Sequence, residues 1–304
     1  MDKRKQGIAL LITLMVIASI MSIIAVSFTY LEKVQKDAGA TSAIIQGDLL
    51  YNNTMAKLKQ FFPSKSDNSD KLELIYRTPL PLSEGKSGFS LNISCQPLMI
   101  GAPISWLDEG FTKSVPEKTI LTKNILQNIM EQYEIEEPNK LEELLLQTIT
   151  GKYLQNEEYT PRIKTQKGII SKKQFERIIT DYALQYDDPK ALNISWDKYF
   201  SFTKVDRKTK IDGVYLSAEF ISAAFDIPIE IVQDSWIVGQ STLVSFLRDN
   251  SISLPNNMKK IYSNKALNAM HCEQIFAYKG RQYEFNFDYI EGRSSNFEFN
   301  GQKQ

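Results

Sequence analysis

The longest apolar run of the chain extends from Ile8 to Leu31 and contains no charged residue. Its only polar side chains are small hydroxyls and Tyr30. A helix of this length rises about 1.5 Å per residue and can cross a bilayer core about 30 Å thick. The pattern therefore predicts a helix that spans a membrane once, followed by a polar remainder outside the bilayer.

A helical pattern continues from Tyr30 to Phe62, and Pro63 is expected to end it because proline cannot continue a helix ladder. Apolar residues recur there at spacings near three, four and seven, with charged residues between them. They predict one apolar stripe that packs on the chain's own domain, made of Leu31, Val34, Ala38, Ile45, Leu49, Met55, Leu58 and Phe62.

Two stretches after this helix are predicted as strands of a first hairpin. The first is the apolar-rich stretch Leu72–Arg77, and the second is Gly88–Cys95, where apolar and polar residues alternate with the period of a half-buried strand. The segment between them predicts a turn, with Pro79, Pro81, Glu84 and Gly85. Aromatic-rich strands return near the end of the chain, at 273–279, 282–290 and 296–299.

Between these two sets of strands lies a helical block, from about residue 114 to residue 250. Apolar residues recur every four positions from Leu121 to Tyr133 and again from Leu141 to Tyr153. Ser171 and Gln174 have the form of a capping box, which predicts a helix start. Shorter helices are predicted at 217–225, 229–236 and 242–248. The order of elements predicts an α+β fold, in which a long N-terminal helix packs on a small antiparallel sheet interrupted by a large all-α insertion.

Charge and histidine content limit the classes of function. Lys+Arg and Asp+Glu are both 36, so the net charge is zero, which argues against a nucleic-acid partner because such binding relies on excess cations. His271 is the single histidine, so no multi-histidine metal site can form. Its neighbour Cys272 points to the opposite face of a strand, so the two are poorly placed as a catalytic pair. The sequence therefore predicts no enzyme and no catalytic residue.

The two cysteines, Cys95 and Cys272, leave two arrangements open. In an oxidising compartment they can form a disulfide, but two free buried cysteines give the same sequence pattern.

The residues before the apolar run, Met1–Gly7, form a short basic leader. The positive-inside rule places Lys3, Arg4 and Lys5 in the cytoplasm and the domain after the span on the other side of the membrane. A basic leader that ends in Gly and is followed directly by an apolar helix resembles the class III signal of type IV pilins and type II secretion pseudopilins. The resemblance implies that prepilin peptidase cuts between Gly7 and Ile8, and that the new N-terminus is methylated.

Two other interpretations of the leader are a plain signal anchor and a cleaved secretory signal cut near Ala25-Val26-Ser27. Ile12 distinguishes the pilin-like interpretation further, because the family's major subunits carry Glu at this fifth mature position. A carboxylate inside a bilayer costs about 2.5–3.5 kcal/mol unless it is paired. In the family it is thought to pair with the N-terminal ammonium of the subunit already in place. A subunit that enters first has no such neighbour and gains nothing from the Glu.

The K-type minor pseudopilin, the tip subunit of type II secretion systems, typically lacks this Glu and has a pilin-like core interrupted by a helical insertion. The chain resembles this variant. The resemblance implies a leader at 1–7, a transmembrane and extended helix at 8–62, a first part of the pilin-like domain at 63–113, a helical insertion domain at 114–250 and completing strands at 251–304.

The resemblance also implies a function and a location. The chain would initiate and cap the periplasmic pseudopilus, anchored once in the bacterial inner membrane with its C-terminal domain in the periplasm. Its partners would be other minor pseudopilins, prepilin peptidase, the inner membrane and secreted substrate proteins. Two alternatives remain: a minor pilin of a type IV pilus or competence system, and a signal-anchored periplasmic enzyme or binding protein.

Calcium is the one candidate cofactor. K-type pseudopilins bind calcium in their helical region, which makes Asp181, Asp187 and Asp188 the candidate ligands here. Calcium prefers six to eight oxygen ligands, often from Asp-rich loops. Leu184 and Tyr186 stand where the family's acidic run would have acids, so solvated turn carboxylates are the alternative interpretation.

Overall fold

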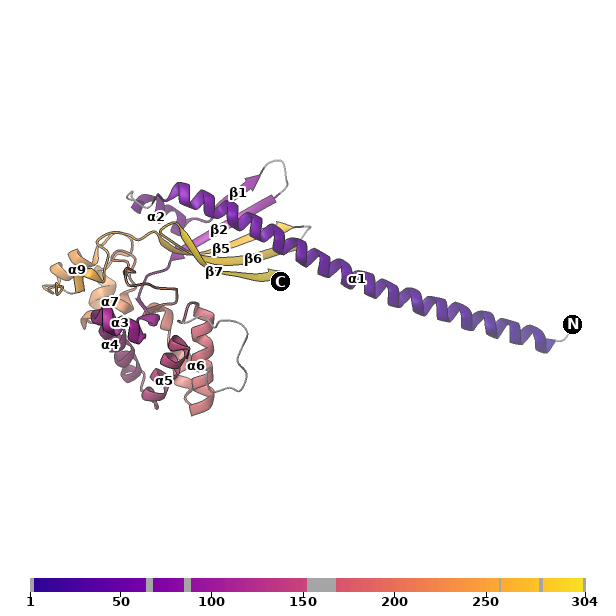
Figure 1. Ribbon diagram of the computed structural model, residues 1–304, viewed down its shortest axis with the longest axis horizontal. Helices are drawn as coiled ribbons and strands as arrows, with labels where there is room; N and C mark the ends of the chain where they lie inside the picture. Colours follow the sequence, from indigo (N-terminus) through magenta and orange to yellow (C-terminus); the bar gives the residue numbers. More distant parts are fainter. Residues whose placement is uncertain are drawn as a thin grey trace.

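The computed structural model describes residues 3–63, 68–84, 89–151, 168–256, 258–278 and 281–302. Up to residue 20 this description covers the backbone alone. Within these residues, the chain forms a long helix, a five-stranded sheet and a helical lobe (Figure 1).

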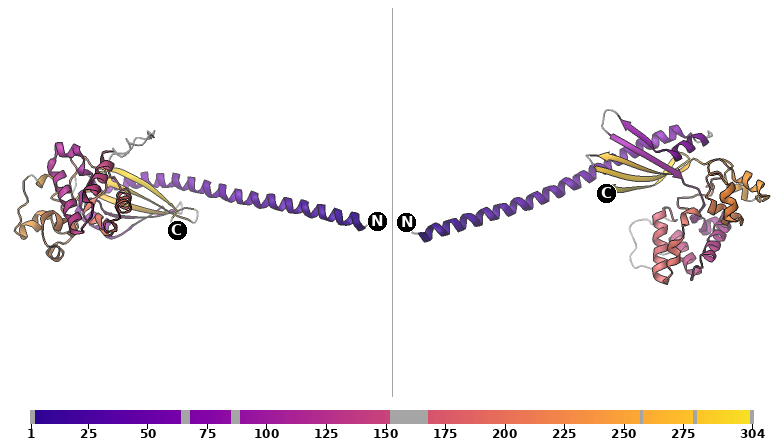
Figure 2. Two further views of the ribbon diagram at one scale, coloured as in Figure 1. Left: turned by 90° about the horizontal axis from the view of Figure 1, so that it is seen from below. Right: turned by 180° about the vertical axis from the view of Figure 1, so that it is seen from behind.

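Helix α1 (Lys3–Phe61) crosses the sheet with its C-terminal part and projects far from the rest of the molecule with its N-terminal part (Figures 1 and 2). It ends two residues before Pro63, as the sequence predicts. No helix of the described part of the chain has the length and apolar character needed to cross a membrane. The membrane-spanning first half predicted from the sequence is therefore not confirmed.

The main sheet is antiparallel throughout, with the strand order β1-β2-β5-β6-β7. Its strands are β1 (Leu80–Glu84), β2 (Phe89–Pro97), β5 (Ala269–Tyr278), β6 (Arg281–Ile290) and β7 (Arg293–Gln302). The three strands predicted at the end of the chain are confirmed. Strands β2 and β5 are neighbours in the sheet although the whole helical lobe lies between them in sequence.

The first predicted hairpin is wrong in one strand. Residues Ser69–Arg77 form helix α2, in which Leu72 and Ile75 are buried while Leu74 is 52% exposed. A spacing of three between buried positions is helical, and a short apolar run cannot be assigned to strand or helix by periodicity alone. The partner of β2 is instead β1, from the stretch predicted as a turn. Its Pro81 is tolerated because β1 lies at the sheet edge.

The helical lobe lies between β2 and β5 in sequence, and it contains a short two-stranded sheet besides its helices. Its helices include α3 (Glu109–Ser114), α4 (Pro116–Gln132), α5 (Pro138–Thr150), α6 (Lys172–Tyr186), α7 (Ala218–Phe225), α8 (Ile229–Ser235) and α9 (Leu243–Asp249). Short 3-10 turns occur at Ile104–Leu107, Pro189–Asn193, Trp196–Lys198 and Met258–Lys260, and β3 (Ala102–Pro103) pairs with β4 (Phe200–Ser201). Ser171 caps α6 by accepting a hydrogen bond from the backbone N–H of Gln174.

The molecule has two separate buried apolar clusters. One fills the helical lobe and includes Trp106, Phe175 and Phe220. The other lies between the sheet and the helices α1 and α2, and it includes Leu58 and Phe285. The lobe therefore has its own core, separate from the core under the sheet.

Candidate assembly surface and its supporting contacts

One face of α1 packs on the sheet and fixes the direction of the helix. Ala43, Met55 and Leu58 are buried on this face. A Cβ atom added at Gly47 would lie 3.2 Å from the ring of Phe299, so the absence of a side chain lets helix and sheet approach closely. The ring of Tyr51 contacts aromatic rings of the sheet, with centroids 5.3 Å from Phe287 and 4.7 Å from Phe297.

The opposite face of α1 carries exposed apolar side chains. Val34, Ile45 and Leu49 are 46%, 57% and 52% exposed, and we call them the outward stripe. Their spacings of eleven and four residues are close to whole turns of a helix with about 3.6 residues per turn. These three residues share one side of the helix, away from the sheet.

The outward stripe corrects the single stripe predicted from the sequence. That prediction placed Val34, Ile45 and Leu49 on the same packed face as Met55 and Leu58. Leu49 and Met55 are six residues apart, which turns the helix by well over one and a half turns, so Met55 faces the sheet where Leu49 does not. The exposed apolar surface continues into the projecting part of α1, where Met21, Val26, Phe28 and Tyr30 are 65–70% exposed.

Exposed apolar residues in such number mark a surface that contacts a protein or a membrane. The residues assigned to processing and first insertion, Gly7, Ile8 and Ile12, belong to the same helix. Their side chains are outside the described part of the chain, so the cut after Gly7 and the role of Ile12 stay predictions.

A polar junction connects the sheet to the helical lobe, and we call it the Asp288 junction. Asp288 is buried on β6, and its carboxylate accepts hydrogen bonds from Nδ1 of His271 at 2.8 Å and from Oγ1 of Thr203 at 3.0 Å. The Nδ2 of Asn296 donates to the same carboxylate and to the carbonyl of Ile170. Thr203 and Ile170 belong to the lobe segment, so the junction ties β5, β6 and β7 to it.

Electrostatics at this junction favour a protonated His271. The hydrogen bond to Asp288 raises the pKa of His271, and burial acts in the opposite direction. From the sequence, His271 was evaluated only as a metal ligand or catalyst, and its partner Asp288 was not predicted. The available signal was an acid between Phe287 and Tyr289 in an aromatic strand, where an ionised side chain needs buried partners.

A second junction is built around Asp212, which is 2% exposed. Its carboxylate accepts hydrogen bonds from the backbone N–H groups of Val214, Tyr215 and Leu267 at 2.7, 3.0 and 2.7 Å. Burial raises the pKa of Asp212 to about 6, although these hydrogen bonds lower it. The contact with Leu267 joins the lobe to the chain segment that leads into β5.

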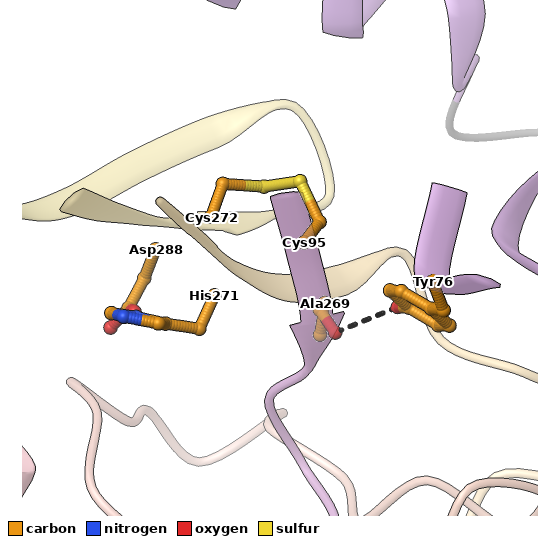
Figure 3. Close-up of a disulfide and its surroundings, with 6 residues drawn as sticks. All are labelled: Tyr76, Cys95, Ala269, His271, Cys272 and Asp288. Carbon is orange, nitrogen blue, oxygen red and sulfur yellow. Dashed lines mark hydrogen bonds and ion pairs between the residues drawn. A yellow bond between two sulfur atoms is a disulfide. The ribbon is translucent and has the colours of Figure 1, made fainter. Parts of the chain in front are cut away.

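The structure joins Cys95 of β2 to Cys272 of β5 in a disulfide, which is the first of the two arrangements left open by the sequence (Figure 3). Both cysteines are almost completely buried. Nearby, the hydroxyl of Tyr76 on α2 donates a hydrogen bond to the carbonyl of Ala269 at 3.3 Å (Figure 3).

The three predicted calcium ligands do not form a metal-binding group. Asp181 and Asp187 are exposed, and Asp187 ends α6 in a left-handed conformation. Asp188 is buried, and its carboxylate is used by the chain itself, accepting from the backbone N–H of Glu136 at 2.9 Å and from the hydroxyl of Tyr182 at 3.1 Å. Within the described residues, no three acidic, histidine or cysteine side chains are placed to hold a metal ion.

Comparison with solved structures finds a likeness in fold to a secretion complex. The chain is similar to one chain of the crystal structure of the GspK-GspI-GspJ complex from the enterotoxigenic Escherichia coli type 2 secretion system. The identity is 14%, the match covers 85% of this chain and 98% of that chain, and the TM-score is 0.53. No protein-family model and no curated protein matches the chain. At this identity the likeness establishes the fold, and the chain has the fold of one component of that secretion complex.

Proposed function

We propose that this chain is a K-type minor pseudopilin of a type II secretion system, which initiates and caps a periplasmic pseudopilus. The proposal rests on the arrangement of the helix, the sheet and the lobe. A projecting helix with an outward apolar stripe lies on a sheet, and a large helical lobe is inserted between neighbouring strands β2 and β5. The similarity in fold to a component of the GspK-GspI-GspJ complex supports it.

Assembly would occur through α1. The outward stripe of Val34, Ile45 and Leu49 would pack against the helices of other minor pseudopilins, which removes these side chains from water. The charge-free run from Ile8 to Leu31 would anchor the chain in the inner membrane, with the basic leader in the cytoplasm and the sheet and lobe in the periplasm. The role is mechanical, with no catalysis by this chain.

Two features favour the tip position. Ile12 replaces the Glu that pairs with a preceding subunit, so insertion does not require a subunit already in place. The lobe also projects to one side of the sheet and α1, so regular stacking of identical subunits would bring bulky lobes against one another (Figure 2). The lobe argues equally against an ordinary minor pilin, which lacks such an insertion.

The mass of the mature N-terminus tests the processing step. Expression with a prepilin peptidase should yield a chain that begins at N-methylated Ile8, and a Gly7→Arg variant should remain uncut. An intact Met1 with active peptidase present, or a cut near Ala25-Val26-Ser27, would contradict the proposal.

Co-expression tests the assembly step. The chain should co-purify with other minor pseudopilins of its own system, and deletion of residues 8–62 should abolish the complex. A complex that survives this deletion would show that α1 is not the assembly surface.

A further inference from the structure

A groove of about 420 Å³ lies in the helical lobe, between α4 and the end of α7. Leu121 and Ile125 of α4, 5% and 1% exposed, lie at its base, while Ile120 is 56% exposed beside them. Phe225 and Met258 complete the apolar lining. Met is flexible and polarizable, so it adapts to ligand side chains of different shape.

Two amide side chains line the same groove. Asn124 and Asn128 are exposed and one helical turn apart on α4, about 6 Å along the axis. Alternate residues of an extended chain repeat about every 6.5 Å, so the two spacings are close. Each amide offers both donors and an acceptor, which can pair with the N–H and C=O groups of an extended segment. Across the groove, the small Ala223 and Ala224 leave room for a main chain.

The charge of the groove is negative. Glu117 and Asp226 are lining residues, and neither forms an ion pair with a cation in the described part of the chain. Asp226 follows the C-terminal end of α7, where the helix dipole disfavours an anion, so a bound cation would be favourable there. Lys259, next to the lining residue Met258, instead donates to Oδ1 of Asn256 at 2.9 Å.

The surroundings strengthen this charge. From Ile211 to Leu247 the sequence contains no Lys, Arg or His, and its exposed acids include Glu230 and Asp234 of the adjacent α8. Lys259 and Lys260 follow the lining residue Met258, so the negative charge is strongest on the side of α7 and α8, where it attracts cationic segments and raises their rate of association.

We propose that the groove between α4 and α7 binds an extended segment of a partner protein in which basic and aliphatic residues alternate. The aliphatic side chains occupy the apolar base beside Ile120 and Phe225, the main chain pairs with Asn124 and Asn128, and the cations lie against Glu117 and Asp226. This inference concerns the lobe and requires nothing of α1, so its failure would leave the proposed function unaffected.

The test uses the full chain in detergent and a short, capped, fluorescently labelled peptide of alternating lysine and leucine. Fluorescence anisotropy should show saturable binding, and peptides of alternating glutamate and leucine or lysine and serine should bind far more weakly. The double variant Glu117→Gln/Asp226→Asn should weaken the lysine–leucine peptide about tenfold, since it removes two charge-assisted contacts. The variant Asn124→Ala/Asn128→Ala should weaken it as well.

The matched control is Gln127→Ala/Glu131→Gln, which changes exposed residues on α4 outside the lining and should leave binding unchanged. Absence of binding, equal binding of the acidic peptide, or an equal loss in the control variant would overturn the proposal. Sedimentation of each variant without peptide tests whether a second copy of this chain occupies the groove. If the groove variants change self-association instead of peptide binding, the groove is a contact between copies of this chain and the proposal is wrong.

Discussion

Cys95 and Cys272 lie directly opposite each other on β2 and β5, although they are 177 positions apart in the chain. The residues between them include the whole helical lobe. Both belong to the buried cluster that contains Leu58 of α1 and Leu72 of α2. The two strands from which the lobe extends are therefore joined covalently, underneath the helices that cover the sheet.

The variant Cys95→Ala/Cys272→Ala should lower the free energy of unfolding by about 2–5 kcal/mol, because the bond restricts a very long loop in the unfolded chain. Urea unfolding followed by circular dichroism would measure this loss. A reductant should destabilise the natural chain by a similar amount and leave the double variant unchanged. Equal stability of the natural chain with and without reductant would contradict the prediction.

Substitutions on the two faces of α1 should separate assembly from stability. Ile45→Lys/Leu49→Lys should change the unfolding free energy little, because both side chains are already exposed, but should abolish co-purification with other minor pseudopilins. Leu58→Ala should instead lower the unfolding free energy by about 2–5 kcal/mol, because it leaves a cavity between helix and sheet. If the lysine variant still co-purifies, the outward stripe is not the contact surface.

Asp212 and Asp206 offer a matched pair of turn-forming acids that differ in burial. Asp212→Ala should cost at least about 2 kcal/mol of stability, because three backbone N–H groups lose their acceptor and two of these hydrogen bonds are buried. Asp206 also accepts from two backbone N–H groups, of Lys208 and Thr209, but it is exposed and water can replace it. Asp206→Ala should therefore cost clearly less, as chemical denaturation of the two variants would show.

The Asp288 junction should make stability depend on pH near neutrality. The pKa of His271 is raised above its ordinary value of 6.5 in the folded chain, so the folded state binds this proton more tightly than the unfolded state. The resulting stabilisation is fully present below pH 6.5 and is lost as pH rises through the folded pKa. Besides Asp288, the acids Glu273 and Glu298 contribute in the same direction.

The unfolding free energy of the natural chain should therefore decrease as pH rises from 6 to 9. The variant His271→Gln should show a smaller dependence on pH in this range. A separate decrease is expected as pH rises from 3.8 to about 6, because the pKa of Asp212 is raised from 3.8 to about 6 in the folded chain, and measurements extended down to this range would record it. That second decrease should persist in the His271 variant. An unchanged slope near neutrality in His271→Gln would show that another group is responsible.

The elements with strong local signals were predictable from the sequence. Pro63 set the end of α1, the Ser171 cap set the start of α6, and the alternation from Phe89 to Cys95 set β2. The strand predicted at Leu72–Arg77 was wrong because a six-residue apolar-rich stretch fits either a strand or one and a half turns of helix. The packing of Leu72 and Ile75 against the sheet favours the helix, and the local sequence does not contain this information.

The surface of α1 was predictable only in part. The sequence shows that Ile45, Leu49, Met55 and Leu58 recur at helical spacings, but it does not show which of them a sheet will cover. The partners of Asp288 were beyond local reasoning, because Thr203 and Ile170 come from a part of the chain that reaches β6 only through the fold of the lobe. The basic leader and the apolar run that follows it were evident from the sequence, and the cut between Gly7 and Ile8 stays a prediction.

The insertion of the lobe between neighbouring strands has a consequence for how the chain folds. Pairing of β2 with β5 closes a loop of more than one hundred residues, and contacts between such distant segments form slowly. A lobe with its own core can fold first and bring its two ends together, which shortens the search for the correct strand register. The sheet would then be completed last, so the state of the lobe would determine when the surface of α1 is ready for a partner.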